Sequence, residues 1–141
     1  MKIKLALICL ALFTACSNSK TNKDLKTENK LEGMWTLKSG KWSNNDGTFL
    51  VYPGDSLLEG LTANIIYSKS HFNVIASAPK MNYSRTEHVK YTLEEGKIKA
   101  HIVFSNIDGS NGKESIWALD FKDDLATFTN DENIEVWKKV E

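Results

Sequence analysis

The sequence predicts an all-β protein, an antiparallel up-and-down β-barrel of about eight to ten strands. From residue 31 onward, apolar and polar residues alternate in short segments, which is the period of a half-buried strand. Turn-forming residues separate these segments, and none of them has the pattern of a long amphipathic helix. An antiparallel meander of this length tends to close, because closure removes exposed strand edges. A β-sandwich has similar strand spacing, so this pattern alone leaves both architectures open.

Nine segments carry the strand pattern, and turn-forming residues join them. They are residues 34–42, 48–52, 62–67, 71–76, 88–94, 97–103, 114–121, 125–129 and 134–140. Residues 55–61 are expected to be an irregular connection with room for one short helical turn. Residues 77–86, which include Pro79, are expected to be strand-free and to form a long loop of the kind that covers a barrel mouth as a lid.

The best-defined element is a hairpin that turns at Glu95-Gly96. In this register, one face collects only apolar and aromatic residues, in the pairs Leu93 with Ile98, Tyr91 with Ala100 and Val89 with Ile102. The other face is mostly charged or polar and pairs Glu94 with Lys97, Thr92 with Lys99, Lys90 with His101 and His88 with Val103. A slip of one residue would mix the two faces, so the sorting fixes the register.

Aromatic side chains recur on the inferred inner face of the next two strands. They alternate with polar residues in the set Trp117, Leu119, Phe121, Ala126 and Phe128. The last strand is ambiguous, because both of its faces are partly apolar. A two-residue turn at Asp131-Glu132 places Glu135 opposite Phe128 and therefore inside, whereas a three-residue turn gives that place to Val136. An inward Glu135 needs a polar partner and is a candidate polar contact for a ligand.

The N-terminus has the pattern of an export signal: a positive start at residues 1–4 precedes an apolar run at residues 5–13 that is too short to span a bilayer, and Thr14-Ala15 precedes Cys16. Because a cysteine follows the small residues, this stretch resembles a bacterial lipoprotein signal. This resemblance implies removal of residues 1–15 and attachment of acyl chains such as palmitate to Cys16. We therefore expect a lipid-anchored protein of the bacterial cell envelope, on the outer membrane facing the periplasm. An ordinary cleaved signal that releases a free periplasmic protein is the alternative.

Residues 16–30 are expected to be a lipidated flexible tether, because Leu25 is the one large apolar side chain between Ser17 and Lys30. The two cysteines are both accounted for, since Cys9 lies in the removed segment and Cys16 carries the lipid. No thiol then remains for a disulfide, a metal site or a nucleophile. The domain at residues 31–141 must be held together by its core.

Charge and composition exclude several classes of function. The chain has 18 basic and 18 acidic residues, whereas nucleic-acid-binding proteins usually carry a basic excess. Arg85 is the one arginine, so no arginine cluster can recognise phosphate groups. We expect no nucleic-acid partner.

Four motifs follow one another along residues 31–141. They are Gly33-Met34-Trp35, Ile66-Tyr67-Ser68 followed by His71-Phe72, the strand of Tyr91, and the ending Glu135-Val136-Trp137-Lys138-Lys139-Val140. In this order they resemble a bacterial lipocalin-like domain of the lipocalin/calycin superfamily. Gly33 and Trp35 match the G-x-W signature that opens the first barrel strand. Lipocalins usually pack an arginine from the last strand over this tryptophan, and here Lys138 and Lys139 stand in that place. Lysine supplies the charge over the ring but not the planar stacking.

The resemblance favours the barrel over the sandwich and implies a small hydrophobic or amphipathic ligand inside it. The candidate ligand-binding residues are Tyr67, Phe72, Tyr91, Trp117, Phe121, Phe128 and Glu135. The same rings would instead form the core if they fill the barrel. The alternative function is then a non-enzymatic envelope module that meets a protein partner through an outer face or a loop.

We expect no enzymatic activity, no cofactor and no metal site. His88 and His101 share the outer face of the hairpin, without an obvious carboxylate partner, and His71 opens a strand, where a surface or capping role is expected. The acidic pairs Glu94-Glu95, Asp123-Asp124 and Asp131-Glu132 fall at expected turns. Acid–base catalysis instead needs carboxylates in a partly buried cleft. Residues 108–112 lack the spacing of a calcium loop and are expected to form a hairpin turn.

Overall fold

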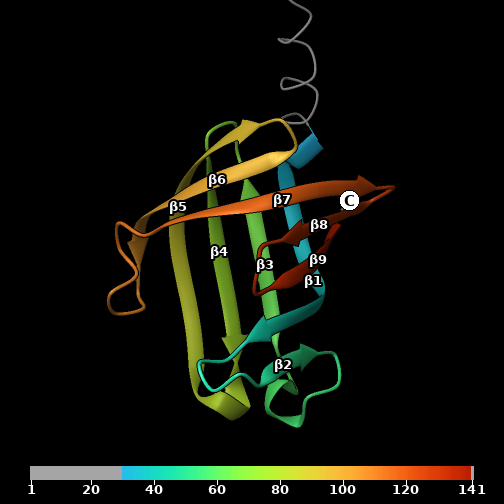
Figure 1. Ribbon diagram of the computed structural model, residues 1–141, viewed down its shortest axis with the longest axis vertical. Helices are drawn as coiled ribbons and strands as arrows, with labels where there is room; N and C mark the ends of the chain where they lie inside the picture. Colours follow the sequence, from blue (N-terminus) through green and yellow to red (C-terminus); the bar gives the residue numbers. More distant parts are fainter. Residues whose placement is uncertain (1–29, 141) are drawn as a thin grey trace, which may run out of the picture.

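Nine antiparallel strands form one sheet in the computed structural model, which describes residues 30–140 (Figure 1). The strands are β1 (Gly33–Ser43), β2 (Phe49–Tyr52), β3 (Thr62–Tyr67), β4 (His71–Ala78), β5 (Tyr83–Glu94), β6 (Lys97–Ser105), β7 (Glu114–Lys122), β8 (Leu125–Thr129) and β9 (Ile134–Lys139). Two short 3-10 helices, η1 (Ser56–Leu58) and η2 (Pro79–Met81), lie between strands. The expected signal peptide, Cys16 and the tether up to residue 29 lie outside the described residues. No helix within residues 30–140 is long and apolar enough to cross a membrane.

The sheet closes into a barrel because β1 pairs with β9 as well as with β3. Eight strands, β1 and β3 to β9, form the closed barrel, and β2 is an additional strand. The first half of β1 pairs with β3, and its second half pairs with β2. Closure decides between the two architectures that the strand pattern left open, in favour of the barrel.

The predicted hairpin is confirmed in its apolar register. Leu93 pairs with Ile98, Tyr91 with Ala100 and Val89 with Ile102. Glu95 and Gly96 both have positive φ, at 48° and 77°, as a two-residue turn between twisted strands requires. The outer pair predicted for His88 is wrong, because a β-bulge between His88 and Val89 shifts the pairing of His88 to Phe104.

The long mouth loop predicted at residues 77–86 is also wrong. Strand β4 continues to Ala78, and β5 already begins at Tyr83. Pro79 ends β4 and begins η2, and Asn82 then takes a left-handed conformation, with φ of 49°, that reverses the chain. The 3-10 turn therefore replaces the expected lid with a tight connection, and both flanking strands extend toward the mouth.

A bulge in β1 turns Trp42 into the barrel. Pairing with β9 shifts between Leu37 and Ser39, so the inward positions change phase from Trp35 and Leu37 to Gly40 and Trp42. The Trp42 indole lies over Gly40, where a Cβ atom would collide with the ring. Gly40 is therefore required by the close approach of a side chain two residues along the same strand.

One end of the barrel is sealed by the signature tryptophan. Trp35 is 2% exposed, and its indole N–H donates a hydrogen bond of 2.7 Å to the carbonyl of the fully buried Leu31. The Nζ of Lys139 lies 5.5 Å from the Trp35 ring centroid, so this lysine takes the place of the arginine that lipocalins usually pack there. Gly33, with φ of 117°, leaves room for the Lys139 stem, since a Cβ there would lie 3.3 Å from Lys139 Cε.

The opposite end is covered by η1 and η2 (Figure 1). Leu58 of η1 is 5% exposed and points into the barrel mouth, and Asp55 caps the turn by accepting a hydrogen bond from the Leu57 backbone N–H. The exposed side chains of Glu59 and Lys80 form an ion pair between the two segments. A short helical turn was expected between residues 55 and 61, and this turn closes part of the mouth.

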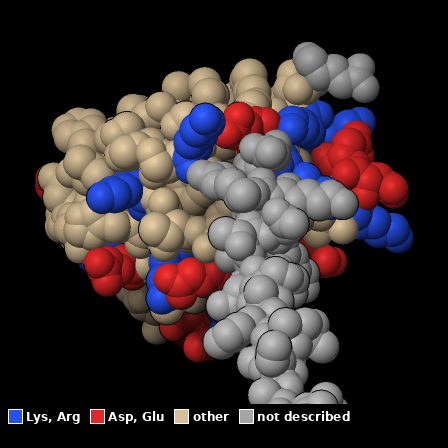
Figure 2. All heavy atoms as spheres, turned by 90° about the horizontal axis from the view of Figure 1, so that it is seen from above, with Lys and Arg blue, Asp and Glu red and all other residues tan. Residues whose placement is uncertain are grey.

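Acidic and basic side chains are interspersed on the face of the molecule that Figure 2 shows. Figure 2 looks onto the sealed end and shows Lys and Arg among Asp and Glu, with no large patch of one sign on the visible described atoms. The acidic pairs at Glu94-Glu95, Asp123-Asp124 and Asp131-Glu132 are exposed at turns, as predicted.

Candidate ligand-binding site

The barrel encloses a cavity of about 330 Å³ between the Trp35 seal and the η1–η2 mouth. Small side chains on the inner face leave this space open. Ala63 of β3 pairs directly with Ala76 of β4, and Ala78 and Ala100 also line the cavity. Because an alanine side chain is a single methyl group, neighbouring alanines on the inner face leave much of the interior unfilled.

Most of the cavity wall is apolar. Leucine, isoleucine, valine and aromatic side chains make up the greater part of it, including Leu37, Leu61, Ile65, Phe72, Val74, Val89, Ile98 and Phe128. A wall of this kind with a few placed polar groups is typical of a small-molecule site.

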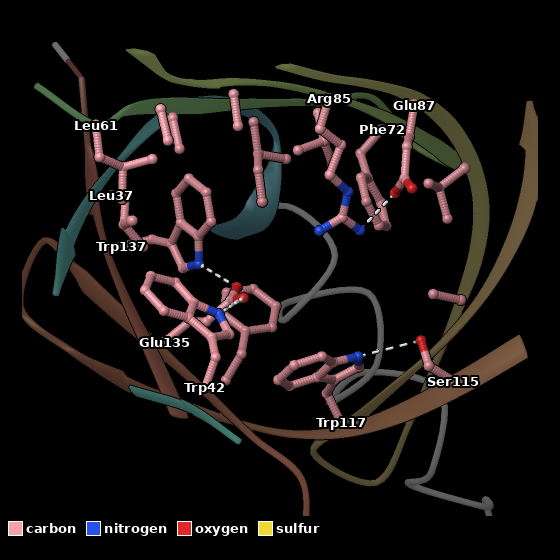
Figure 3. A pocket seen from close by; sticks show the side chains of 18 of the residues that line it. Leu37, Trp42, Leu61, Phe72, Arg85, Glu87, Ser115, Trp117, Glu135 and Trp137 are labelled. Carbon is pink, nitrogen blue, oxygen red and sulfur yellow. Dashed lines mark hydrogen bonds and ion pairs between the residues drawn. The ribbon is translucent and has the colours of Figure 1, made fainter. Parts of the chain in front are cut away.

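Glu135 is the polar centre of one side of the cavity (Figure 3). Its Oε1 accepts a hydrogen bond of 2.8 Å from the indole N–H of Trp42, and its Oε2 accepts one of 3.0 Å from Trp137. Thr129 pairs with Ile134 and Phe128 with Glu135, so the turn at Asp131-Glu132 has two residues and turns Glu135 inside. Of the two alternatives left open by the sequence, the structure shows the inward Glu135.

A second polar group enters from β5. Arg85 Nη2 donates a hydrogen bond of 2.6 Å to Glu87 Oε2, and the hydroxyl of Ser105 donates one of 3.0 Å to Glu87 Oε1. Glu87 is 3% exposed, and the Arg85 side chain is 38% exposed. Both line the cavity, and Figure 3 shows the guanidinium reaching toward its centre.

The cavity perturbs two titratable groups. Burial raises the pKa of Tyr67 well above its ordinary value of 10.0, and the negative charge of Glu135 and the neighbouring Tyr91 raise it further. For Arg85, burial lowers the pKa, but the hydrogen bond and the charge of Glu87 outweigh it, so the pKa lies above its ordinary value. Arg85 therefore stays protonated, and Tyr67 stays a neutral phenol.

Five of the seven predicted ligand-binding residues line the cavity. They are Tyr67, Phe72, Trp117, Phe128 and Glu135. Trp117 is held by a hydrogen bond of 3.1 Å from its indole N–H to Ser115 Oγ.

The other two lie outside the cavity wall. Tyr91 is 4% exposed, donates its hydroxyl to the Ser68 carbonyl at 2.6 Å and packs edge-on against Tyr67. Phe121 packs against Trp35 in the seal, with ring centroids 6.2 Å apart.

Six polar or aromatic residues of the cavity wall were missed: Trp42, Tyr83, Arg85, Glu87, Ser115 and Trp137. A signal existed for three of them, since counting back in steps of two from Val89 puts Glu87, Arg85 and Tyr83 on the same inner face. Two of these three are charged. The charges themselves argued against that placement. Trp42 depends on the β1 bulge, and Trp137 shares the face of Glu135 that the pattern left undecided.

The histidines lie outside the cavity wall. The rings of His71 and His88 stack with centroids 5.0 Å apart, and His101 Nδ1 lies 3.4 Å from Glu114 Oε1. Within residues 30–140, no group of three or more His, Cys, Asp or Glu side chains is placed to hold a metal ion. Residues 108–112 lie in the connection between β6 and β7, as predicted, where Asn111 Oδ1 accepts a hydrogen bond from the Ser105 backbone N–H.

Two solved structures resemble this chain. A lipocalin-like protein from Bacteroides uniformis matches with a TM-score of 0.54 and 18% identity, over 79% of this chain and 99% of the other. An uncharacterized protein from Bacteroides eggerthii matches with a TM-score of 0.52 and 14% identity, over 78% of this chain and 99% of the other. No protein-family model and no curated protein matches the sequence.

The fold and the cavity together define a class of protein, the hollow antiparallel barrel. Its likeness to the lipocalin-like structure shows that the fold is lipocalin-like, as the sequence motifs predicted. At these identities the likeness concerns the fold alone, and any ligand must be argued from the residues of this chain.

Proposed function

We propose that this protein binds and carries a small hydrophobic or amphipathic molecule inside the barrel. The observation that carries the proposal is the largely apolar cavity with its placed polar groups, Glu135 and the Arg85–Glu87 pair. An apolar ligand gains about 25 cal/mol for each Å² of its surface removed from water. The cavity also supports this role over the alternative of a filled barrel that acts only through a protein partner.

The size of the cavity limits the ligand. The cavity of about 330 Å³ lies at the lower end of the range for small-molecule sites. A short alkyl chain or a single substituted ring suits a cavity of this size.

Binding rather than catalysis is the role that we propose. A buried ionisable pair is the feature that favours an enzyme, and the cavity contains one in Arg85 and Glu87. However, a guanidinium does not exchange protons at accessible pH, and both oxygens of Glu87 accept hydrogen bonds from Arg85 and Ser105. The pair is therefore better suited to orient a ligand as a fixed polar group of the cavity wall than to act as an acid–base couple.

Native mass spectrometry tests the carrier role. Protein purified from its own cell envelope is expected to release, on mild activation, a noncovalently bound small molecule of defined mass. An empty barrel that retains a protein partner instead would overturn the proposal in favour of the interaction module.

We also propose that the protein is a lipoprotein of the bacterial envelope, anchored through Cys16 and facing the periplasm. The support is the signal-like N-terminus with Thr14-Ala15 before Cys16. A carrier anchored to a membrane would encounter small apolar molecules there, because such molecules partition into the lipid bilayer. No nucleic-acid partner is proposed, because the net charge is zero and the signs are interspersed in Figure 2.

Substitution of Cys16 tests the anchor. The Cys16→Ala variant cannot carry an acyl chain, so it is expected to move from the membrane pellet to the soluble fraction of a cell fractionation. Ser17→Ala is the matched control and should remain in the membrane pellet. A Cys16→Ala protein that stays with the membrane would contradict the lipid anchor.

A further inference from the structure

The charges that line the cavity do not balance. Among the described residues of its wall, three are charged: the guanidinium of Arg85 and the carboxylates of Glu87 and Glu135. Arg85 and Glu87 form an ion pair at 2.6 Å, and the charge of Glu135 also acts on Arg85, so the wall carries two negative charges against this one positive charge. Within residues 30–140, no cationic side chain lies within ion-pair distance of Glu135, and its direct partners are the neutral indoles of Trp42 and Trp137.

Glu135 also has acceptor capacity to spare. A carboxylate has about four lone-pair sites, and the two indole N–H groups use one on each oxygen. The indoles fix the orientation of the carboxylate without neutralising it. The remaining lone pairs can accept a further hydrogen bond from a ligand, and a cationic donor adds charge complementarity to that bond.

The walls near this carboxylate suit a cation. Trp42 and Trp137 flank Glu135, and Trp117 lies on the same side of the cavity (Figure 3). Tryptophan faces attract ammonium groups more strongly than other aromatic rings do. Tyr67, which stays neutral, adds an aromatic ring and a phenol oxygen to the same cavity.

An anionic ligand is disfavoured by the same geometry. Arg85 is the one cation of the described cavity wall, and Glu87 already holds it with a hydrogen bond. An entering carboxylate would compete with Glu87 for that guanidinium and would meet two negative charges against one positive charge. Releasing Glu87 would leave a carboxylate that is 3% exposed without its cation.

We propose that the ligand is a small hydrophobic amine, whose protonated nitrogen donates hydrogen bonds to Glu135 between the indoles of Trp42 and Trp137 while its apolar body fills the cavity. This inference rests on the proposed carrier function and names the chemical class of its ligand.

Three probes that share one alkyl chain test the proposal: octylamine, octanol and octanoate. At neutral pH the amine is a cation, the alcohol is neutral and the acid is an anion. The full chain carrying Cys16→Ala is titrated by calorimetry, so that no acyl chain or detergent micelle takes up the probe. We expect octylamine to bind about tenfold more tightly than octanol, because its ammonium donor and the Glu135 acceptor are both charged, whereas the octanol hydroxyl is neutral. Octanoate is expected to bind most weakly.

Glu135→Gln should remove the preference. The substitution keeps the size of the side chain and removes its charge, so octylamine should lose more affinity than octanol and the ratio of octylamine to octanol affinity should fall to about one. Glu132→Gln is the matched control, because Glu132 is exposed in the turn before β9. This substitution changes the net charge of the protein by the same amount as Glu135→Gln. It should leave the ratio unchanged.

The outcomes separate the ligand class from the carrier function. Equal binding of the three probes, or tightest binding of octanoate, would overturn the amine proposal and leave the carrier function standing. Failure of all three to bind would overturn both. The order of the three probe affinities, measured on the protein with native Glu135, tests the amine proposal even if Glu135→Gln does not fold.

Discussion

Replacing Trp35 by alanine is expected to lower the free energy of unfolding by about 3–5 kcal/mol, as for other large-to-small changes in a core. Trp35 is 2% exposed and packs against Phe121 in the seal of the barrel. Truncation also leaves the buried carbonyl of Leu31 without the indole donor at 2.7 Å and removes the ring beneath Lys139. Thermal unfolding followed by circular dichroism should show a midpoint lowered by roughly 10–20 °C.

Trp35→Phe separates the contributions of the ring and its N–H group. It keeps an aromatic ring under Lys139 but cannot donate to Leu31, so a loss of about 1–2 kcal/mol is expected. A Trp35→Ala variant that loses less than about 1 kcal/mol would contradict the assignment of Trp35 as the residue that seals the barrel.

Filling the cavity is expected to abolish ligand binding. Ala76 lies on the inner face of β4, opposite Ala63, in the part of the wall that small side chains leave open. In Ala76→Trp, an indole enters the cavity of about 330 Å³ and takes up space that the ligand would occupy. Each methylene that no longer fits costs about 0.8 kcal/mol, so exclusion of four methylenes weakens octanol binding on the order of a hundredfold. Calorimetry of octanol binding measures this loss.

Ile75→Trp is the matched control for bulk. Ile75 precedes Ala76 on β4, is 53% exposed and lies on the outer face. The same indole at this position should leave octanol affinity unchanged. If Ala76→Trp folds and still binds octanol as tightly as the native protein, the ligand does not occupy the barrel interior.

The strands and their faces were predictable where local patterns agreed. Alternation together with the Glu95-Gly96 turn specified the hairpin, because each register error would have exposed an apolar face. The same holds for β7 and β8, whose inward Trp117 and Phe128 were predicted. The Gly33–Trp35 signature marked the start of the barrel, and the structure explains both residues through their contacts with Lys139.

Bulges and turn lengths were not predictable from the alternation. The β1 bulge after Leu37 brings Trp42 inside, although a strict period of two from Trp35 points it outward. The two-residue turn before β9 decides the side of Glu135, and the apolar residues on both faces of that strand gave no means to choose. Each of these features changes the phase of the pattern by one residue.

The charged pair in the cavity wall breaks the alternation of apolar inward and polar outward residues by which a strand is predicted from sequence. Arg85 and Glu87 occupy inward positions of β5, where an apolar residue is expected. They fall within or beside the segment around Pro79 that was predicted as a loop. Because a buried pair is stabilised by contacts between side chains, such as Ser105 on Glu87, its placement follows from the tertiary structure and not from local sequence.

The indole N–H resonances of the four tryptophans provide the most direct test of ligand binding inside the barrel. Trp42, Trp117 and Trp137 line the cavity, whereas Trp35 lies in the seal outside its wall. In a titration with octanol followed by nitrogen–proton correlation spectra, the three cavity signals should shift with one common dissociation constant, and the Trp35 signal should stay in place. Shifts confined to Trp35, or no saturable shift at all, would contradict binding in the barrel.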